Sequence, residues 1–139
     1  MRISATPTYA KALGELLEVA PFSAHVRGQC MAPVIDDESL VTVEPGARLR
    51  CGDVLVWRDA AGQWVCHRYL GRFPGRRGLG SVSWADNESG PDALVPDASV
   101  LGKVIQVDGA TLRCGPTARL RHRWRFLRSC ARRIRGLLR

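Results

Sequence analysis

Short runs rich in Val, Ile, Trp and Thr, interrupted by Gly and Pro every few residues, dominate the chain from about residue 22 to residue 107. Runs of this length are typical of β-strands, and the intervening glycines and prolines are typical of tight turns. They predict strands within SAHVRG, SLVTVEP, DVLVWRD, QWVCHRYLG, GSVSWAD and VLGKVIQVDG, separated by PGARLRCG, AAG, FPGRRGLG and NESGPD. We therefore expect a mostly β domain of six or seven strands.

Helical periodicity is found at the two ends of the chain. PTYAKALGELLEVA, residues 7–20, places apolar residues at helical spacing and ends at Pro21, which predicts a short amphipathic helix. From Thr117 onward, apolar residues recur at steps of four and three with arginines between them, which predicts a basic amphipathic helix. The expected organisation is an N-terminal helix and lead-in at 1–21, a β-rich domain at 22–108, and a strand with an Arg-rich helix at 109–139.

The net charge of +8 is distributed unevenly along the 139 residues. Residues 1–108 hold 11 Lys and Arg against 13 Asp and Glu, whereas residues 109–139 hold 10 Arg and no acidic residue. The predicted C-terminal helix therefore has three interpretations. Its apolar stripe packs on the β domain and leaves the arginines solvated, or the helix lies on an anionic membrane surface, or it binds nucleic acid. Nucleic acid is the least favoured partner, because the body is acidic and has no recognisable DNA-reading module.

The five cysteines give no sign of a disulfide framework or a metal site. Their number is odd, and no two of them form a CxxC pair, so we expect reduced thiols, no metal and no cofactor. No run approaches the roughly 18 apolar residues that a membrane-spanning helix needs. We expect a cytoplasmic protein, with residues 117–139 as the segment suited to peripheral contact with the inner face of a membrane.

The stretch RGQCMAP, residues 27–33, places Cys30 in an unusual setting between a glycine and a Met-Ala-Pro sequence. A cysteine attacks a carbonyl as its thiolate, and a neighbouring imidazole is the usual acceptor of its proton. His25, His67 and His122 are the candidates for that imidazole. Composition alone does not choose among them.

Five blocks in sequence order resemble those of the S24/S26 peptidase superfamily, which contains the type I signal peptidases and the LexA-type self-cleaving repressors. The blocks are VRGQCMAPVIDDESLVTVEP, LRCGDVLVWRD, QWVCHRYLG, WADNESGPD and VLGKVIQV. In that family a G-x-S-M-x-P block carries the nucleophile and a G-D pair follows. The base is Lys or, in the endoplasmic reticulum and archaeal types, His within V-x-H-R, and a G-D-N-N-x-x-x-D block comes next. The resemblance implies a signal-peptidase/LexA-like catalytic domain.

Matched position by position, the resemblance implies Cys30 as the nucleophile and His67 as the general base. Asp86 and Asn87 match the G-D-N-N block, and Asp92 matches its trailing aspartate. One of the two aspartates is expected to orient His67, as the third member of a triad does, and Asp86 is preferred. Cys51, Cys66, Cys114 and Cys130 lack such a context and are expected to be packing residues.

Further positions around the nucleophile are implied as supporting residues. Met31 and Pro33 complete the nucleophile's block and are expected to shape the loop that presents Cys30, which Gly28 and Gln29 precede. The oxyanion is expected to rest on backbone N–H groups, chiefly that of Cys30. Asp53, which with Gly52 matches the G-D pair, is more plausible as a turn residue than as a chemical group.

The chain departs from the family pattern at three positions, and we expect it to have no membrane anchor. Cys30 replaces the nucleophilic serine, and Ala85 replaces the glycine before Asp86. Gly28 stands where signal peptidases often supply a hydroxyl to the oxyanion hole. A thiol is easier to ionise beside an imidazole than a hydroxyl is, so pairing Cys with His favours activity.

These features predict a signal-peptidase-like endopeptidase that cleaves an extended leader or propeptide through Cys30 and His67. The expected partner is a peptide or protein substrate that adds to an exposed strand edge beside Cys30. A catalytically silent domain that binds peptides or scaffolds a partner is the first alternative. A LexA-like DNA-associated regulator that uses the basic tail is the second.

Overall fold

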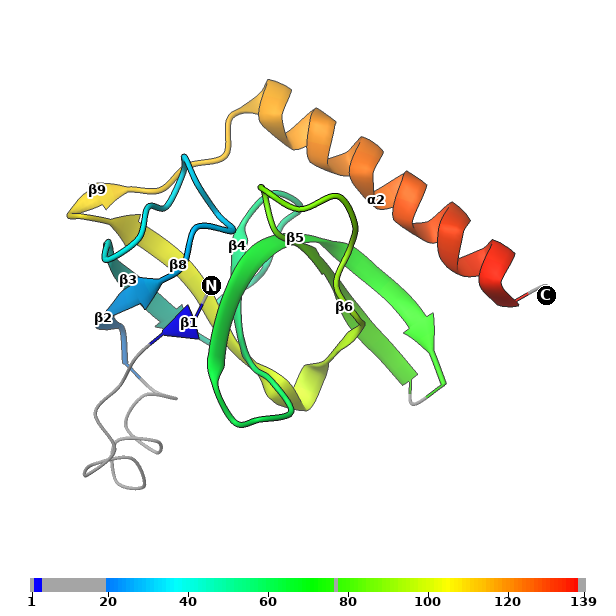
Figure 1. Ribbon diagram of the computed structural model, residues 1–139, viewed down its shortest axis with the longest axis horizontal. Helices are drawn as coiled ribbons and strands as arrows, with labels where there is room; N and C mark the ends of the chain where they lie inside the picture. Colours follow the sequence, from blue (N-terminus) through cyan, green and yellow to red (C-terminus); the bar gives the residue numbers. More distant parts are fainter. Residues whose placement is uncertain (1, 4–19, 77, 138–139) are drawn as a thin grey trace.

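The computed structural model describes residues 2–3, 20–76 and 78–137 (Figure 1). The helix predicted at residues 7–20 falls almost wholly outside this part of the chain. The described strands are β1 (Arg2–Ile3), β2 (Phe22–Arg27), β3 (Leu40–Pro45), β4 (Val54–Arg58), β5 (Trp64–Gly75), β6 (Gly78–Trp84), β7 (Val95–Pro96), β8 (Val100–Val107) and β9 (Ala110–Thr111). A 3₁₀ turn, η2 (Asp97–Ser99), precedes β8, and α2 (Pro116–Leu137) ends the described chain.

The prediction of a mostly β domain with a C-terminal helix is confirmed. Each of the six predicted strand segments overlaps one of the longer strands: β2, β3, β4, β5, β6 and β8. The strands form one antiparallel sheet in the order β1-β2-β3-β8-β4-β5-β6-β7, and β9 pairs with β8. Because β1 pairs with β5 as well as with β2, the path from β1 to β5 closes into the ring seen in Figure 1.

The main core lies on one face of the sheet that forms this ring. It consists of Val26, Met31, Ile35, Val41, Val43, Val54, Val56, Cys66, Leu101 and Val104, all of them buried. β-Branched residues recur at alternate positions of β3 and β4 and point into this core. The intervening Leu55 and Trp57 of β4 are buried in a separate cluster on the other face of the strand. Gly102 on the central strand β8 lies against β3, where an added Cβ would lie only 2.1 Å from the carbonyl oxygen of Glu44. Only glycine allows this close approach of the two backbones.

The segment FPGRRGLG was predicted as a connection, but strands continue into it from both sides. Pro74 pairs with Leu79 and Gly75 with Gly78, so β5 and β6 form a long hairpin with its turn near residue 76. Phe73 explains the extension, because it is buried in a second cluster with Leu70, Val82 and Trp84. This apolar contact holds the strands together where Gly and Pro alone predict a loop.

α2 packs on the hairpin of β5 and β6 through one narrow face. Phe126 and Cys130 contact the cluster around Trp84, while His122 and Ser129 are buried beside them. The apolar stripe of this helix is exposed, at Leu120, Trp124, Leu127 and Ile134. The first of the three interpretations, in which the stripe packs on the β domain, is therefore wrong. Within residues 20–76 and 78–137, the structure contains no helix long and apolar enough to span a membrane.

Candidate active site

Cys30 lies in the turn that follows β2. Gly28 opens this turn with a φ of 108°, a conformation that favours glycine, and its N–H donates to Asp37 Oδ1 at 2.8 Å. Met31 is fully buried, and its carbonyl accepts a hydrogen bond from the N–H of Ile35 at 3.1 Å. The turn is thus anchored on both sides of the cysteine, whose side chain remains partly exposed.

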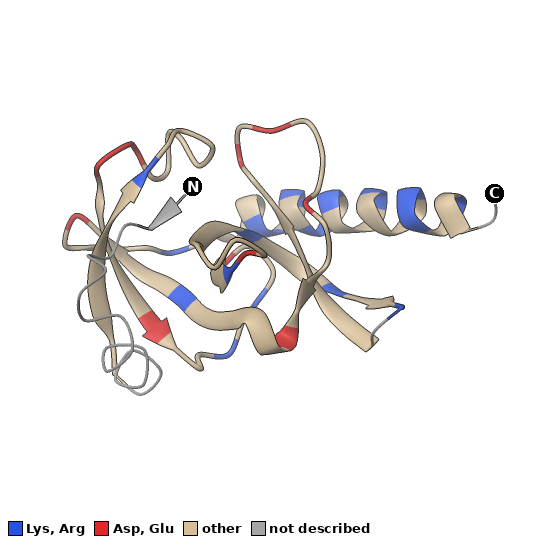
Figure 2. Cartoon of the chain, turned by 60° about the horizontal axis from the view of Figure 1, so that its bottom comes forward, with Lys and Arg blue, Asp and Glu red and all other residues tan. Residues whose placement is uncertain are grey.

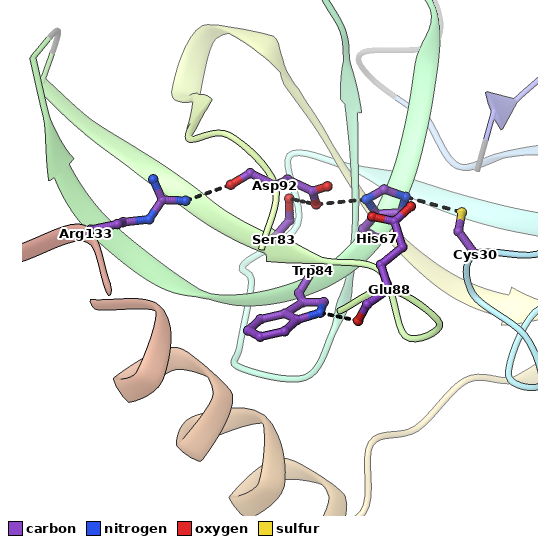
Figure 3. A network of polar contacts seen from close by, with 7 residues as sticks. All are labelled: Cys30, His67, Ser83, Trp84, Glu88, Asp92 and Arg133. Carbon is purple, nitrogen blue, oxygen red and sulfur yellow. Dashed lines mark hydrogen bonds and ion pairs between the residues drawn. The ribbon is translucent and has the colours of Figure 1, made fainter. Parts of the chain in front are cut away.

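His67 reaches Cys30 from the middle of β5. The residue is 7% exposed, and its Nε2 lies 3.3 Å from Cys30 Sγ (Figure 3). Trp57 on the neighbouring strand β4 packs edge-on to the imidazole, with ring centroids 5.3 Å apart. The aromatic contact and the position in a paired strand hold the imidazole in place beside the thiol.

Asp92 lies on the other side of the imidazole. Its Oδ2 is 2.8 Å from His67 Nδ1 and accepts a second hydrogen bond from the Ser83 hydroxyl at 2.7 Å. Burial raises the pKa of Asp92, but the hydrogen bonds of His67 and Ser83 and the charge of His67 outweigh burial and keep this pKa below its usual value. An ionised Asp92 accepts a hydrogen bond from Nδ1–H, and this orients Nε2 toward the thiol as the acceptor for its proton.

Asp86 was the preferred candidate for orienting His67, and the structure corrects this choice. Its carboxylate forms an ion pair with the buried Arg68, and its Oδ1 is 3.7 Å from the guanidinium of Arg125 on α2. Successive residues of a strand point to opposite faces, so Arg68 is directed away from the face that carries His67. Asp86 follows β6 on the Arg68 side, whereas Asp92 returns to the His67 side.

The segment between Asp86 and Asp92 is fastened to the nucleophile turn and to the hairpin. The N–H of Asn87 donates to the carbonyl of Cys30 at 2.9 Å. The indole of Trp84 donates to the carbonyl of Glu88, and the N–H of Asp92 donates to the carbonyl of Ser83. These bonds fix the loop at its beginning and its end, and they set the position of Asp92 relative to Cys30.

Three residues that support this arrangement were not anticipated from the sequence. Ser83 lies in the predicted strand GSVSWAD, where a fully buried hydroxyl requires a polar partner. Arg68 donates to the carbonyl of Gly52 at 2.9 Å and so ties β5 to the turn before β4. Arg133 of α2 donates to the backbone carbonyl of Asp92 at 2.7 Å. The arginine of the V-x-H-R block could have been singled out from the sequence. The contact of Arg133 joins residues far apart in the chain, and no sequence pattern indicates it.

The remaining predicted residues take positions around the turn. Gln29 and Pro33 are exposed beside Cys30, whereas Met31 belongs to the main core. Asp53 accepts a hydrogen bond from the N–H of Arg50, which confirms its role in a turn. It also lies 3.7 Å from the ammonium of Lys103.

Three of the other cysteines, Cys51, Cys66 and Cys130, lie in environments that disfavour the thiolate. Burial raises the pKa of Cys66 to about 12. Burial also raises the pKa of Cys51, which outweighs the effect of nearby Arg123, and it raises the pKa of Cys130. These thiols are therefore internal references for the reactivity of Cys30.

Comparison with known proteins gives no relative: no family model matches the chain, and neither the curated proteins nor the solved structures contain a significant match. The chemistry of the site therefore rests on its geometry. A thiol, an imidazole and a carboxylate lie in line, with contacts of 3.3 and 2.8 Å. Such an arrangement can generate a thiolate and return its proton to a leaving group.

Proposed function

We propose that this protein is a peptidase with a Cys30–His67–Asp92 triad, related to the S24/S26 superfamily. The observation that carries the proposal is the contact of Cys30 Sγ with His67 Nε2 at 3.3 Å. Cys30 and His67 are the residues that the superfamily pattern selects as nucleophile and base, and they lie 37 positions apart in the chain. The contact of His67 with Asp92 adds the third group that a triad requires.

Acylation begins when the proton of the Cys30 thiol passes to His67 Nε2. The thiolate attacks the peptide carbonyl carbon, a C–S bond forms, and the backbone N–H of Cys30 donates to the developing oxyanion. The C–N bond then breaks, and the leaving amine takes the proton from His67. Asp92 holds the imidazole in orientation and stabilises its charged form during both transfers.

Deacylation uses the same groups with water as the nucleophile. Water gives a proton to His67 while its oxygen bonds to the acyl carbon, and the C–S bond breaks. The product leaves as a carboxylic acid, and the departing thiolate recovers its proton from the imidazole.

The substrate in this proposal is an extended peptide that pairs with a strand beside Cys30. β2 and β5 flank the site, and β1 pairs with both: Arg2 is opposite Arg27 on one side and opposite Val65 on the other. At these positions the strand edges are therefore covered by the chain itself, which differs from the exposed edge expected from sequence. A substrate strand would replace β1 or pair beyond it.

Selectivity in the proposal follows the superfamily's preference for small residues before the cut. An Ala- or Gly-containing leader or propeptide is therefore the first substrate class to test. A peptide library of this composition, digested by the wild type and by Cys30→Ala, measures cleavage directly. Products that appear with the wild type and disappear with Cys30→Ala support the proposal.

Alkylation tests the nucleophile without knowledge of the substrate. Iodoacetamide at neutral pH should label Cys30 faster than Cys51 or Cys66, and His67→Ala should suppress this difference. Labelling of Cys30 no faster than of the two reference thiols, with no cleavage in the library, would favour a silent peptide-binding domain. Cleavage by Cys30→Ser but not by the wild type would show that the exchange of serine for cysteine has silenced the site.

A further inference from the structure

α2 presents two different faces, and they lie on opposite sides of the helix. Residues that meet the β domain recur at steps of four, three and four, namely His122, Phe126, Ser129 and Arg133. The exposed apolar residues follow the same steps two positions earlier, namely Leu120, Trp124, Leu127 and Ala131. A shift of two residues rotates a position by about 200° around an α-helix. The apolar stripe therefore points directly away from the β domain.

The packed face fixes the orientation of the helix. Phe126 lies so close to β5 that a Cβ added at Gly71 would come within 2.8 Å of its ring. Arg133 donates to the Asp92 carbonyl, and the guanidinium of Arg125 lies over the Trp84 ring, 5.4 Å from its centroid. α2 cannot turn its apolar stripe inward without losing these contacts.

Large apolar side chains are widely exposed on the outer face. The residues and their exposed fractions are Leu120 (68%), Trp124 (65%), Leu127 (57%) and Ile134 (50%). We name these four residues the outer stripe. Single exposed apolar residues are common, but a continuous stripe along a helix is characteristic of a surface that binds a partner.

Arginines border the outer stripe on both sides. Helical rotation places Arg121, Arg128, Arg132 and Arg135 along one side and Arg123 along the other, all exposed. Within the part of the chain that the structure describes, none of these five forms an ion pair. Figure 2 shows basic residues along α2, while acidic residues colour the β body and its loops. The partner of this face must accept apolar side chains and supply negative charge on both sides of them.

We propose that α2 docks on the surface of an anionic phospholipid bilayer, with the outer stripe inserted between headgroups and the bordering arginines on lipid phosphates. An amphipathic helix with Trp and Leu on one face and arginines beside them has the composition of interfacial helices. A second copy of α2 would bring arginines against arginines. Nucleic acid would engage the arginines but leave the outer stripe in water. The proposal does not depend on peptidase activity.

Vesicle flotation of the full chain tests the docking. The protein should float with vesicles of phosphatidylcholine and phosphatidylserine at a ratio of about 7:3 and remain unbound with phosphatidylcholine alone. Trp124→Ser/Leu127→Ser should weaken binding at least about tenfold, because the apolar insertion is lost. Leu79→Ser is the matched control, since Leu79 is 55% exposed on β6 and should not affect binding.

A charge pair and a spectroscopic readout complete the test. Arg121→Gln/Arg128→Gln should weaken binding and its salt dependence, whereas Arg48→Gln/Arg76→Gln, which removes two exposed arginines from the body, should not. The fluorescence of Trp124 should shift to the blue on binding, and Trp124→Phe should lose that shift while it still floats. Equal binding to neutral vesicles, wild-type binding by the stripe variant, dimerisation through the stripe, or tighter binding to duplex DNA than to vesicles would overturn the proposal.

Discussion

Ser83 and His67 meet at a single atom, the Oδ2 oxygen of Asp92, at 2.7 and 2.8 Å respectively. The serine hydroxyl therefore acts on the same oxygen that orients the imidazole. Two donors on one carboxylate oxygen restrict rotation of the carboxylate and stabilise its ionised form. Substitutions of Asp92 and of Asp86 therefore test two different roles.

Asp92→Asn should slow peptide cleavage by about 10² to 10⁴-fold. The amide cannot replace the carboxylate as a charged acceptor for Nδ1–H, so the imidazole loses both its favoured tautomer and the partner of its charged form. The value of kcat for the best library peptide measures the loss, together with the rate of Cys30 alkylation. An Asp92→Asn protein that cleaves as fast as the wild type would contradict the triad.

Asp86→Asn should affect stability more than catalysis. Arg68 is buried, and removal of the opposing charge leaves its guanidinium without a full counter-charge, at a cost of about 3 kcal/mol in the free energy of unfolding. Arg27→Gln is the matched control, because Arg27 pairs with Glu38 where both side chains are over 60% exposed (68% and 62%). Its cost should stay below about 1 kcal/mol. Urea unfolding compares the two, and equal losses would contradict the assignment of Asp86 to Arg68.

His122 should make stability depend on pH. Burial, aided by the charges of Arg68 and Arg125, lowers the pKa of His122 from 6.5 to about 4. Between these values the unfolded chain binds a proton that the folded chain does not, so the free energy of unfolding falls as the pH drops from 6.5 to about 4. The full contribution is up to about 3 kcal/mol.

Replacement of His122 by Leu should remove most of this slope while leaving stability near pH 7 almost unchanged. The Nδ1 atom of His122 is buried without a hydrogen-bond partner among the described residues, so Leu gives up no polar contact there. Urea unfolding at about pH 7 and about pH 4.5 measures the slope. A variant that keeps the wild-type slope would assign it to another group.

Removal of residues 1–3 should lower KM for an extended peptide several-fold and leave kcat nearly constant. β1 covers the edges of β2 and β5 near the site, so a substrate strand competes with it for the same backbone groups. Arg2→Gln keeps the backbone of β1 and serves as the control with unchanged KM. A rise of KM in the shortened protein would mean that β1 helps to form the binding surface.

The strands were predictable from local patterns, because apolar residues alternate in β3 and form a short continuous run in β4. The Cys30–His67 pair was predicted only through the resemblance of the G-x-C-M-x-P and V-x-H-R blocks to a known family. The choice between Asp86 and Asp92 depended on which face of β5 each loop end reaches, and both aspartates sit in a stretch that reads only as a turn. The outward direction of the outer stripe depended on tertiary packing. Phe126 and Cys130, on the opposite face of α2, occupy the β surface that the stripe would otherwise cover.

The hydrogen bond from Arg133 to the Asp92 carbonyl joins the far end of the chain to the carboxylate behind His67. The C-terminal helix and the Cys30–His67–Asp92 site are therefore structurally linked. A shortened protein that ends before α2 would lose one of the supports of the Asp92 loop along with the basic charge, and a tail transplanted from elsewhere would have to supply a donor at the same place. A sequence change at Arg133 is thus constrained by the geometry of the site, although this residue lies on the C-terminal helix.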